Sequence, residues 1–100
     1  MKISDNCFAV TGLYYYPPWI TNAGFVTGDK TTLVIDSGCS VLTAQTIYGY
    51  AAAAKPENKI MLINTEKHLD HTGGDRYFKD KGASIYGHSN IGNKQEDLIE

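Results

Sequence analysis

The sequence has no long hydrophobic run, few cysteines and no cluster of basic residues. Without an apolar stretch of about 20 residues it offers no candidate membrane-spanning helix. Its 9 Lys and Arg residues are outnumbered by 11 Asp and Glu residues, so it lacks the positive patch that nucleic-acid binding requires. The first residues do not lead into the apolar core of a signal peptide. We therefore expect a cytoplasmic protein with neither a nucleic-acid nor a membrane partner.

The two cysteines, Cys7 and Cys39, are too few and too far apart in the sequence for a disulfide framework or a thiolate zinc site. We interpret both as reduced residues that pack as small hydrophobes. A nucleophilic Cys39 is the weaker alternative, because it would need a histidine within reach, and the nearest histidines along the chain are better explained as metal ligands.

The composition is typical of a folded globular domain. The 100 residues are 42% hydrophobic and 20% charged, enough for one domain with a buried core. We expect a single domain over residues 1–100, and the reasons for expecting it to be incomplete are given below.

Strands are predicted throughout the first third of the chain. Residues 7–11 and 13–16 favour strands with Gly12 as a bend or bulge between them, and the prolines at 17 and 18 end the second strand. Residues 19–22 are predicted to form a loop. The aromatic residues Tyr15, Tyr16 and Trp19 either cover the core, which we prefer, or form a flap over a substrate.

A β-hairpin and a βαβ unit are predicted next. Residues 23–27 and 31–36 flank a short turn, and the second run is continuously apolar, so we expect it to be buried on both faces. Ser40 is a suitable N-cap for a helix to about Lys55, and residues 59–65 form an apolar strand, so the crossover is right-handed. The remaining expected elements are a helix at 75–81, a strand at 83–87 and a helix from about 93.

The segment after the strand at 59–65 gathers residue types that bind metals. Its potential ligands are Glu66, His68, Asp70 and His71. Imidazole and carboxylate groups suit zinc, iron or manganese, and open α/β sheets usually bind ligands at the C-terminal ends of strands. The glycines at 73 and 74 would let the backbone pass close to the ions. The pattern therefore predicts a metal site, or half of one.

The spacing of these residues favours two adjacent metal positions. In an extended segment alternate residues point the same way, so Glu66, His68 and Asp70 would converge while His71 points elsewhere. A natural division pairs Glu66 with His68 at one metal and Asp70 with His71 at the other.

The order of these motifs resembles that of a known family. Asp36-Ser37-Gly38 ends one predicted strand, and Asn64-Thr65 ends the next, directly before Glu-x-His-x-Asp-His-x-Gly-Gly. This is similar to the N-terminal half of the metallo-β-lactamase fold superfamily, whose hallmark is His-x-His-x-Asp-His-x-Gly-Gly. The resemblance runs from about residue 23 to residue 88. It implies an α/β (or α+β) chain, ordered hairpin, helix, strand, metal loop, helix and strand, that forms one αβ half of an αβ/βα sandwich.

The resemblance also implies roles for individual residues. His68 would bind a first metal, and Asp70 and His71 a second. Asp70 would be the catalytic residue, because it would help to orient the metal-activated hydroxide that attacks the substrate. Asp36 resembles the family's strand-end aspartate, which braces the motif loop behind the ligands. The implied function is a metal-dependent hydrolase acting on a small-molecule ester, thioester, lactam or phosphodiester.

Glu66 departs from the family pattern, because it stands where the family has its first histidine. A glutamate still binds a divalent ion, but this harder ligand favours iron or manganese over zinc, which is otherwise the expected metal. The alternative is that Glu66 does not coordinate. Di-iron redox relatives also carry a glutamate, but at the position of His68, and this weakens the hypothesis of a redox protein.

Length is the second departure. Family members have a second αβ half that supplies further ligands. In this sequence His88 is the only histidine after the motif, and we interpret it as a surface or loop residue. A single half would leave an apolar sheet face uncovered. We therefore expect the N-terminal half of a longer hydrolase, a truncated product, or a half that completes itself as a homo-oligomer. A catalytically inactive metal-binding or structural module of the same fold is the main alternative to the hydrolase.

Overall fold

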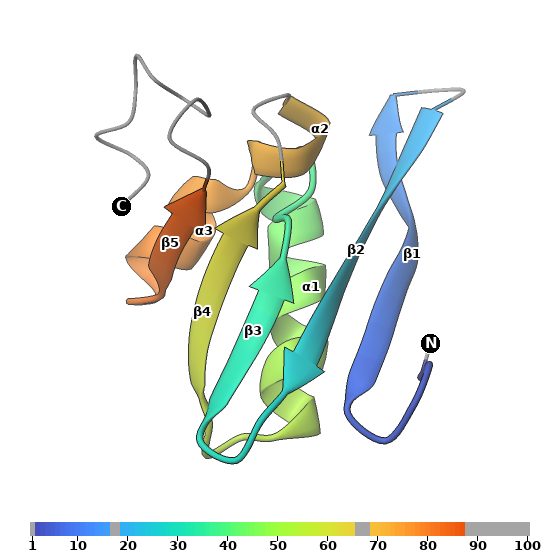
Figure 1. Ribbon diagram of the computed structural model, residues 1–100. Coiled ribbons are helices and arrows are strands. Elements are labelled where there is room, and N and C mark those ends of the chain that lie inside the picture. The colour runs from blue at the N-terminus through green and yellow to red at the C-terminus, as the bar shows by residue number, and fades with distance from the viewer. Residues whose placement is uncertain (1, 17–18, 66–68, 88–100) are drawn as a thin grey trace.

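A computed structural model of the chain describes residues 2–16, 19–65 and 69–87, with the backbone alone described at 14–16, 19–21, 69 and 70. It contains a mixed five-stranded sheet in the order β1-β2-β3-β4-β5 (Figure 1). The strands are β1 (Cys7–Tyr16), β2 (Trp19–Thr27), β3 (Thr31–Ile35), β4 (Lys59–Asn64) and β5 (Ser84–Gly87). The helices are α1 (Val41–Ala54), α2 (Leu69–Thr72) and α3 (Asp75–Asp80). The predicted helix from about residue 93 lies outside the described residues.

The antiparallel pair β1 and β2 confirms two predictions and corrects another. The register shifts between Val10 and Leu13, around Gly12 with its positive φ of 70°, so the predicted irregularity at Gly12 is confirmed. The predicted loop at residues 19–22 is wrong, because β2 begins at Trp19. The prediction that the strand before the prolines ends there is confirmed, because β1 ends at Tyr16. The aromatic side chains of the flap hypothesis lie outside those described.

The predicted hairpin and βαβ unit are both present. β2 and β3 are antiparallel, and β3, β4 and β5 are parallel neighbours. Helix α1 begins with a capping box, in which the Ser40 hydroxyl accepts a hydrogen bond from the Thr43 amide and the Thr43 hydroxyl accepts one from the Ser40 amide. Each residue thereby satisfies an amide that the first turn of the helix leaves without a backbone partner.

The core lies between the sheet and the helices α1 and α3, which both cover the same face (Figure 1). One row of side chains crosses the whole sheet on this face. Its members are Phe8, Phe25, Val34, Leu62 and Ile85. The Phe8 and Phe25 rings stack with their centroids 4.8 Å apart. Tyr48 of α1 meets the rings of Tyr77 and Phe78 of α3 edge to face, so aromatic contacts also join the two helices.

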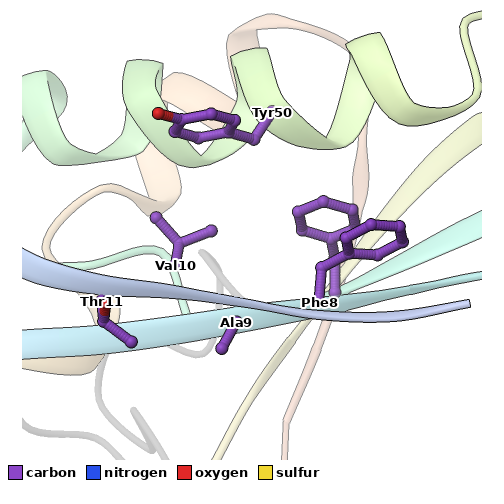
Figure 2. Close-up of a pocket in the computed structure, with 6 residues that line it drawn as sticks. Phe8, Ala9, Val10, Thr11 and Tyr50 are labelled. Atoms are coloured by element: carbon purple, nitrogen blue, oxygen red, sulfur yellow. The ribbon is translucent and has the colours of Figure 1, made fainter. Parts of the chain in front are cut away.

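A hollow of about 230 Å³ lies between the first strand and the first helix (Figure 2). Phe8 and Val10 point from β1 towards Tyr50 of α1, whereas Ala9 and Thr11 point away. This alternation is that of a regular strand. It assigns Ala9 and Thr11 to the opposite face of the sheet.

No helix of the described residues covers that opposite face, and its central residues are uncharged. They are Cys7, Ala9, Gly24, Val26, Leu33, Ile35, Met61, Ile63, Ser84 and Tyr86, which pair in register across the five strands. Tyr86 is 43% exposed there. The prediction that β3 is buried on both faces is therefore wrong, because Val34 under the helices is fully buried while Leu33 and Ile35 are only partly so.

None of the helices in residues 2–16, 19–65 and 69–87 combines the length and hydrophobicity needed to span a bilayer.

Candidate metal site

Two segments of predicted functional importance meet at one edge of the sheet. Strands β3 and β4 are parallel neighbours, with Ile35 paired to Ile63, so both strands end side by side at this edge (Figure 1). The first segment is the loop at residues 36–40. The second, the motif segment, comprises residues 65–74, of which 65 and 69–74 are described, and includes α2. This is the edge at which open α/β sheets usually hold their ligands.

Asp36 is a buried carboxylate that contacts three polar groups of two residues. Its Oδ1 accepts a hydrogen bond of 2.8 Å from the Thr65 amide, and both of its oxygens lie within 3.1 Å of the Thr65 hydroxyl. Its Oδ2 lies 2.8 Å from Nδ1 of His71. The backbone of Asp36 has a φ of 68°, a left-handed conformation that aspartate tolerates better than most residues. Asp36 therefore joins the beginning of the motif segment to one of its predicted ligands.

The contact with Asp36 decides which nitrogen of His71 carries a proton. A carboxylate oxygen only accepts hydrogen bonds, so Nδ1 is the donor, and in the neutral ring Nε2 then carries the lone pair. Most metal-binding histidines are oriented by such a hydrogen bond from their other ring nitrogen to a carboxylate or carbonyl oxygen. The side chain is 25% exposed, and its hydrogen bond to Asp36 orients the ring in the way that is typical of metal-binding histidines.

The other predicted ligands are described less completely. Glu66 and His68 lie outside the described residues, and of Asp70 only the backbone is described. Among the side chains that are described, no three from His, Cys, Asp and Glu gather in a metal-binding group. The predicted ligand set as a whole therefore stays a prediction, and His88 also lies outside the described residues.

The assumption of an extended motif segment is wrong where the backbone is described. Residues Leu69–Thr72 form the single helical turn α2. Neighbouring residues of a helix point about 100° apart. The strand-like alternation on which we divided the ligands therefore does not apply to Asp70 and His71.

The two glycines of the motif bring the motif segment against the loop at 36–40. A Cβ atom on Gly73 would collide with the backbone of Cys39, and one on Gly74 would come within 2.5 Å of the Ala44 Cβ atom and the Ser37 carbonyl oxygen. Close packing of two loops is thus a role for these glycines that differs from the expected passage near metal ions.

A second buried carboxylate, Asp75, was not predicted to belong to the site. Its Oδ1 accepts a hydrogen bond of 2.7 Å from the Ser37 hydroxyl, and its Oδ2 accepts one of 2.6 Å from the Asn64 amide. Burial raises the pKa of Asp75, and the charge of Asp36 raises it further, while the hydrogen bonds from Ser37 and Asn64 lower it. In the sequence Asp75 is simply the first residue of a helix. The available signal was that Ser37 and Asn64 are polar residues at the ends of two buried strands.

Comparison with known families decides the relationship. The sequence model of the metallo-beta-lactamase superfamily matches residues 16–94. The chain belongs to this superfamily. The resemblance drawn from the motifs is thereby confirmed.

Solved structures of the superfamily share the fold of this chain. The metallo-beta-lactamase from Pontibacter korlensis superposes with a TM-score of 0.83 at 15% identity, over 97% of this chain and 46% of its own. The enzyme from Hirschia baltica gives 0.80 at 19% identity, over 99% and 48%. DIM-1 metallo-beta-lactamase, exposed to ceftazidime, gives 0.79 at 19% identity, over 100% and 47%.

This chain therefore spans about half the length of each of these structures. The prediction of one αβ half of the metallo-β-lactamase fold is confirmed. A comparison with curated proteins finds no match.

Proposed function

We propose that this chain carries the N-terminal half of the active site of a metal-dependent hydrolase. The substrate would be a small molecule with an ester, thioester, lactam or phosphodiester bond. The single observation that carries the proposal is the hydrogen bond between Asp36 and His71, which lies at the strand-end edge of the sheet within the region matched by the superfamily.

His71 is the one candidate ligand whose side chain is described, and its contact with Asp36 suits a ligand of a divalent metal ion. Asp36 orients the ring of His71 through Nδ1, and Nε2 would then be the atom that binds the metal. By the family motif, Asp70 would join His71 at one ion, and Glu66 and His68 would hold the other. A bound divalent ion lowers the pKa of a coordinated water towards neutrality and so supplies a nucleophile. Asp70 would orient that nucleophile, while Asp36 would keep His71 in place.

The identity of the metal turns on Glu66. Zinc is the first candidate, because it accepts both histidine and carboxylate ligands. If Glu66 coordinates, its hard oxygen shifts the preference towards iron or manganese.

The uncovered face of the sheet supports the proposal that the site is completed by further protein. Its ten central residues are uncharged, and a face of this kind is normally covered. The superfamily structures are about twice as long as this chain. We favour a second αβ half as the cover, with a homo-oligomer of this chain as the alternative. We further propose that the protein is cytoplasmic and has no nucleic-acid or membrane partner.

One observation favours a second candidate, a module that has the fold but no catalytic activity. Glu66 replaces the first histidine of the family motif, and if it does not coordinate, one metal position loses a ligand. This module would bind one metal ion or none. A di-iron redox protein is the least supported alternative, because its glutamate would stand at the position of His68.

The test is to determine the metal content of the complete protein together with its hydrolytic activity. We expect one or two divalent ions per chain by elemental analysis, and turnover of at least one generic ester, thioester, lactam or phosphodiester substrate. Asp70→Ala and His68→Ala should each abolish turnover, while Asp29→Ala, in the exposed turn between β2 and β3, should not change it. Normal turnover by both site variants would exclude the proposal. Metal binding without turnover would favour the inactive module.

A further inference from the structure

The motif segment is anchored at both of its ends by buried carboxylates. Asp36 binds the amide and hydroxyl of Thr65 at the beginning of the segment. Asp75, directly after the segment, binds Asn64, the residue directly before it. The hydrogen bond between Asp75 and Asn64 therefore closes the segment into a loop, because it joins the residues on either side of it.

Ser37 connects this closure to the candidate metal ligand. Its hydroxyl donates to Asp75 Oδ1 at 2.7 Å and accepts a hydrogen bond of 3.0 Å from the Gly74 amide. Its backbone amide donates to the carbonyl oxygen of His71 at 2.9 Å. Because the Ser37 hydroxyl donates its hydrogen bond to Asp75, a lone pair of the hydroxyl oxygen faces the Gly74 amide. Asp75 thus orients the hydroxyl of Ser37, and the hydroxyl and amide of Ser37 together hold the backbone on both sides of Thr72.

Asp75 is far more buried than the acidic residue at the other end of its helix. Asp75 is 8% exposed, whereas the side chain of Asp80, at the other end of the same six-residue helix, is 66% exposed. A buried carboxylate is costly unless it is well hydrogen-bonded. The hydrogen bonds from Ser37 and Asn64 offset that cost, and both come from the strand-end segments that carry the candidate site.

We propose that Asp75 is a positioning residue of the metal site. Through Ser37 and Asn64 it holds the backbone of the motif segment around His71 in place, so that the His71 ring stays against Asp36. The inference rests on the proposed metal-binding function and adds to it a residue outside the ligand motif. The hydrogen bonds of Asp75 to Ser37 and Asn64 form a bridge between the two strand ends. Removing this bridge would leave the His71 side chain intact but would let its backbone move. The metal would then have to order that backbone when it binds, so its affinity would fall.

The chemistry of the bridge distinguishes two substitutions of the same residue. Asp75→Ala removes both acceptors. Asp75→Asn keeps an oxygen for the Ser37 hydroxyl and places an NH₂ group opposite Asn64. The Asn64 Oδ1 atom is buried and has no hydrogen-bond partner among the described residues. If the Asn64 amide turns over, this oxygen accepts from the new NH₂ group, and the bridge is restored.

The experiment compares the complete protein with Asp75→Ala, Asp75→Asn and the matched exposed control Asp80→Ala. Zinc affinity is measured by competition with a chromophoric chelator, and the coordination geometry by the visible absorption of the cobalt(II)-loaded protein. We expect Asp75→Ala to lose about 10- to 100-fold in zinc affinity and to shift the cobalt bands. Asp75→Asn should stay within about threefold of the wild type, and Asp80→Ala should be unchanged.

The outcomes separate this inference from the proposed function. A wild-type protein that binds no divalent metal overturns the proposed function and the inference with it. If the wild type binds metal and a folded Asp75→Ala variant binds it equally well with unchanged cobalt bands, only the inference is overturned. Equal losses in Asp75→Ala and Asp75→Asn would overturn the bridging role. If Asp75→Ala does not fold, Ser37→Ala removes one arm of the bridge, and unchanged zinc affinity there overturns the inference.

Discussion

The covered face of the sheet and the strand-end edge are stabilised by different interactions. The face under α1 and α3 carries a continuous row of apolar side chains from Phe8 to Ile85. Its stability depends on buried area and close packing, because the hydrophobic effect has no preferred direction. The edge is held by hydrogen bonds among buried polar groups, above all those of Asp36 and Asp75. We therefore expect changes in the first region to affect stability more than the geometry of the site, and changes in the second to affect mainly the site.

The largest expected effect is on the stability of the core. Leu62 of β4 is fully buried, so Leu62→Ala should lower the free energy of unfolding by about 2–5 kcal/mol. Metal affinity, measured below the unfolding transition, should change little. Denaturant unfolding and chelator competition on the same samples check both parts. A loss of metal affinity in the folded variant would show that the two regions are not independent.

A smaller but more specific effect is expected at the edge. Asp36→Asn keeps the shape and suits the left-handed backbone, but it removes the charge that orients His71. We expect zinc affinity to fall by about tenfold. Asp29→Asn, in an exposed turn, is the control and should bind zinc like the wild type. Unchanged zinc affinity in Asp36→Asn would contradict the proposal that Asp36 orients His71.

The smallest expected effect is the pH dependence of the unfolding free energy that arises from Asp75. Because the pKa of Asp75 is raised in the folded state, mainly by burial, the folded protein holds this proton more tightly than the unfolded chain. Stability should therefore fall as the pH rises from the ordinary pKa of 3.8 through the raised folded value, and should then level off. The difference in unfolding free energy between the metal-free wild type and Asp75→Asn, followed across this window, isolates the effect. A difference that grows in favour of the wild type with rising pH would contradict it.

Local sequence patterns predicted most of the fold. The hairpin, the capped helix α1, the strand β4 and the irregularity at Gly12 each depend on neighbouring residues, and each is present. The start of β2 at Trp19 was missed because it depends on pairing with another strand. The half-covered state of β3 was missed because it depends on which face the helices cover.

The sequence supplied a set of candidate ligands that stays a prediction, and it did not predict the network of contacts through Asp75 that supports the motif segment. The motif identified His71 and the family pattern identified Asp36, whereas the bridge through Asp75 joins residues that are far apart in the sequence. Ser37 and Asp75 are 38 positions apart, and no local pattern links them. The single turn α2 was missed because the ligand spacing fits either an extended or a helical segment over so short a distance.

The backbone of Asp36 has a consequence for the substitutions that this position tolerates. Its φ of 68° suits glycine, asparagine and aspartate and penalises every β-branched or bulky residue. Of the three residues that suit it, only aspartate offers a charged oxygen to the His71 ring and a second oxygen to Thr65. In a saturation mutagenesis experiment, therefore, a selection for folding alone should favour glycine, asparagine and aspartate at this position, and a selection for tight metal binding should favour aspartate.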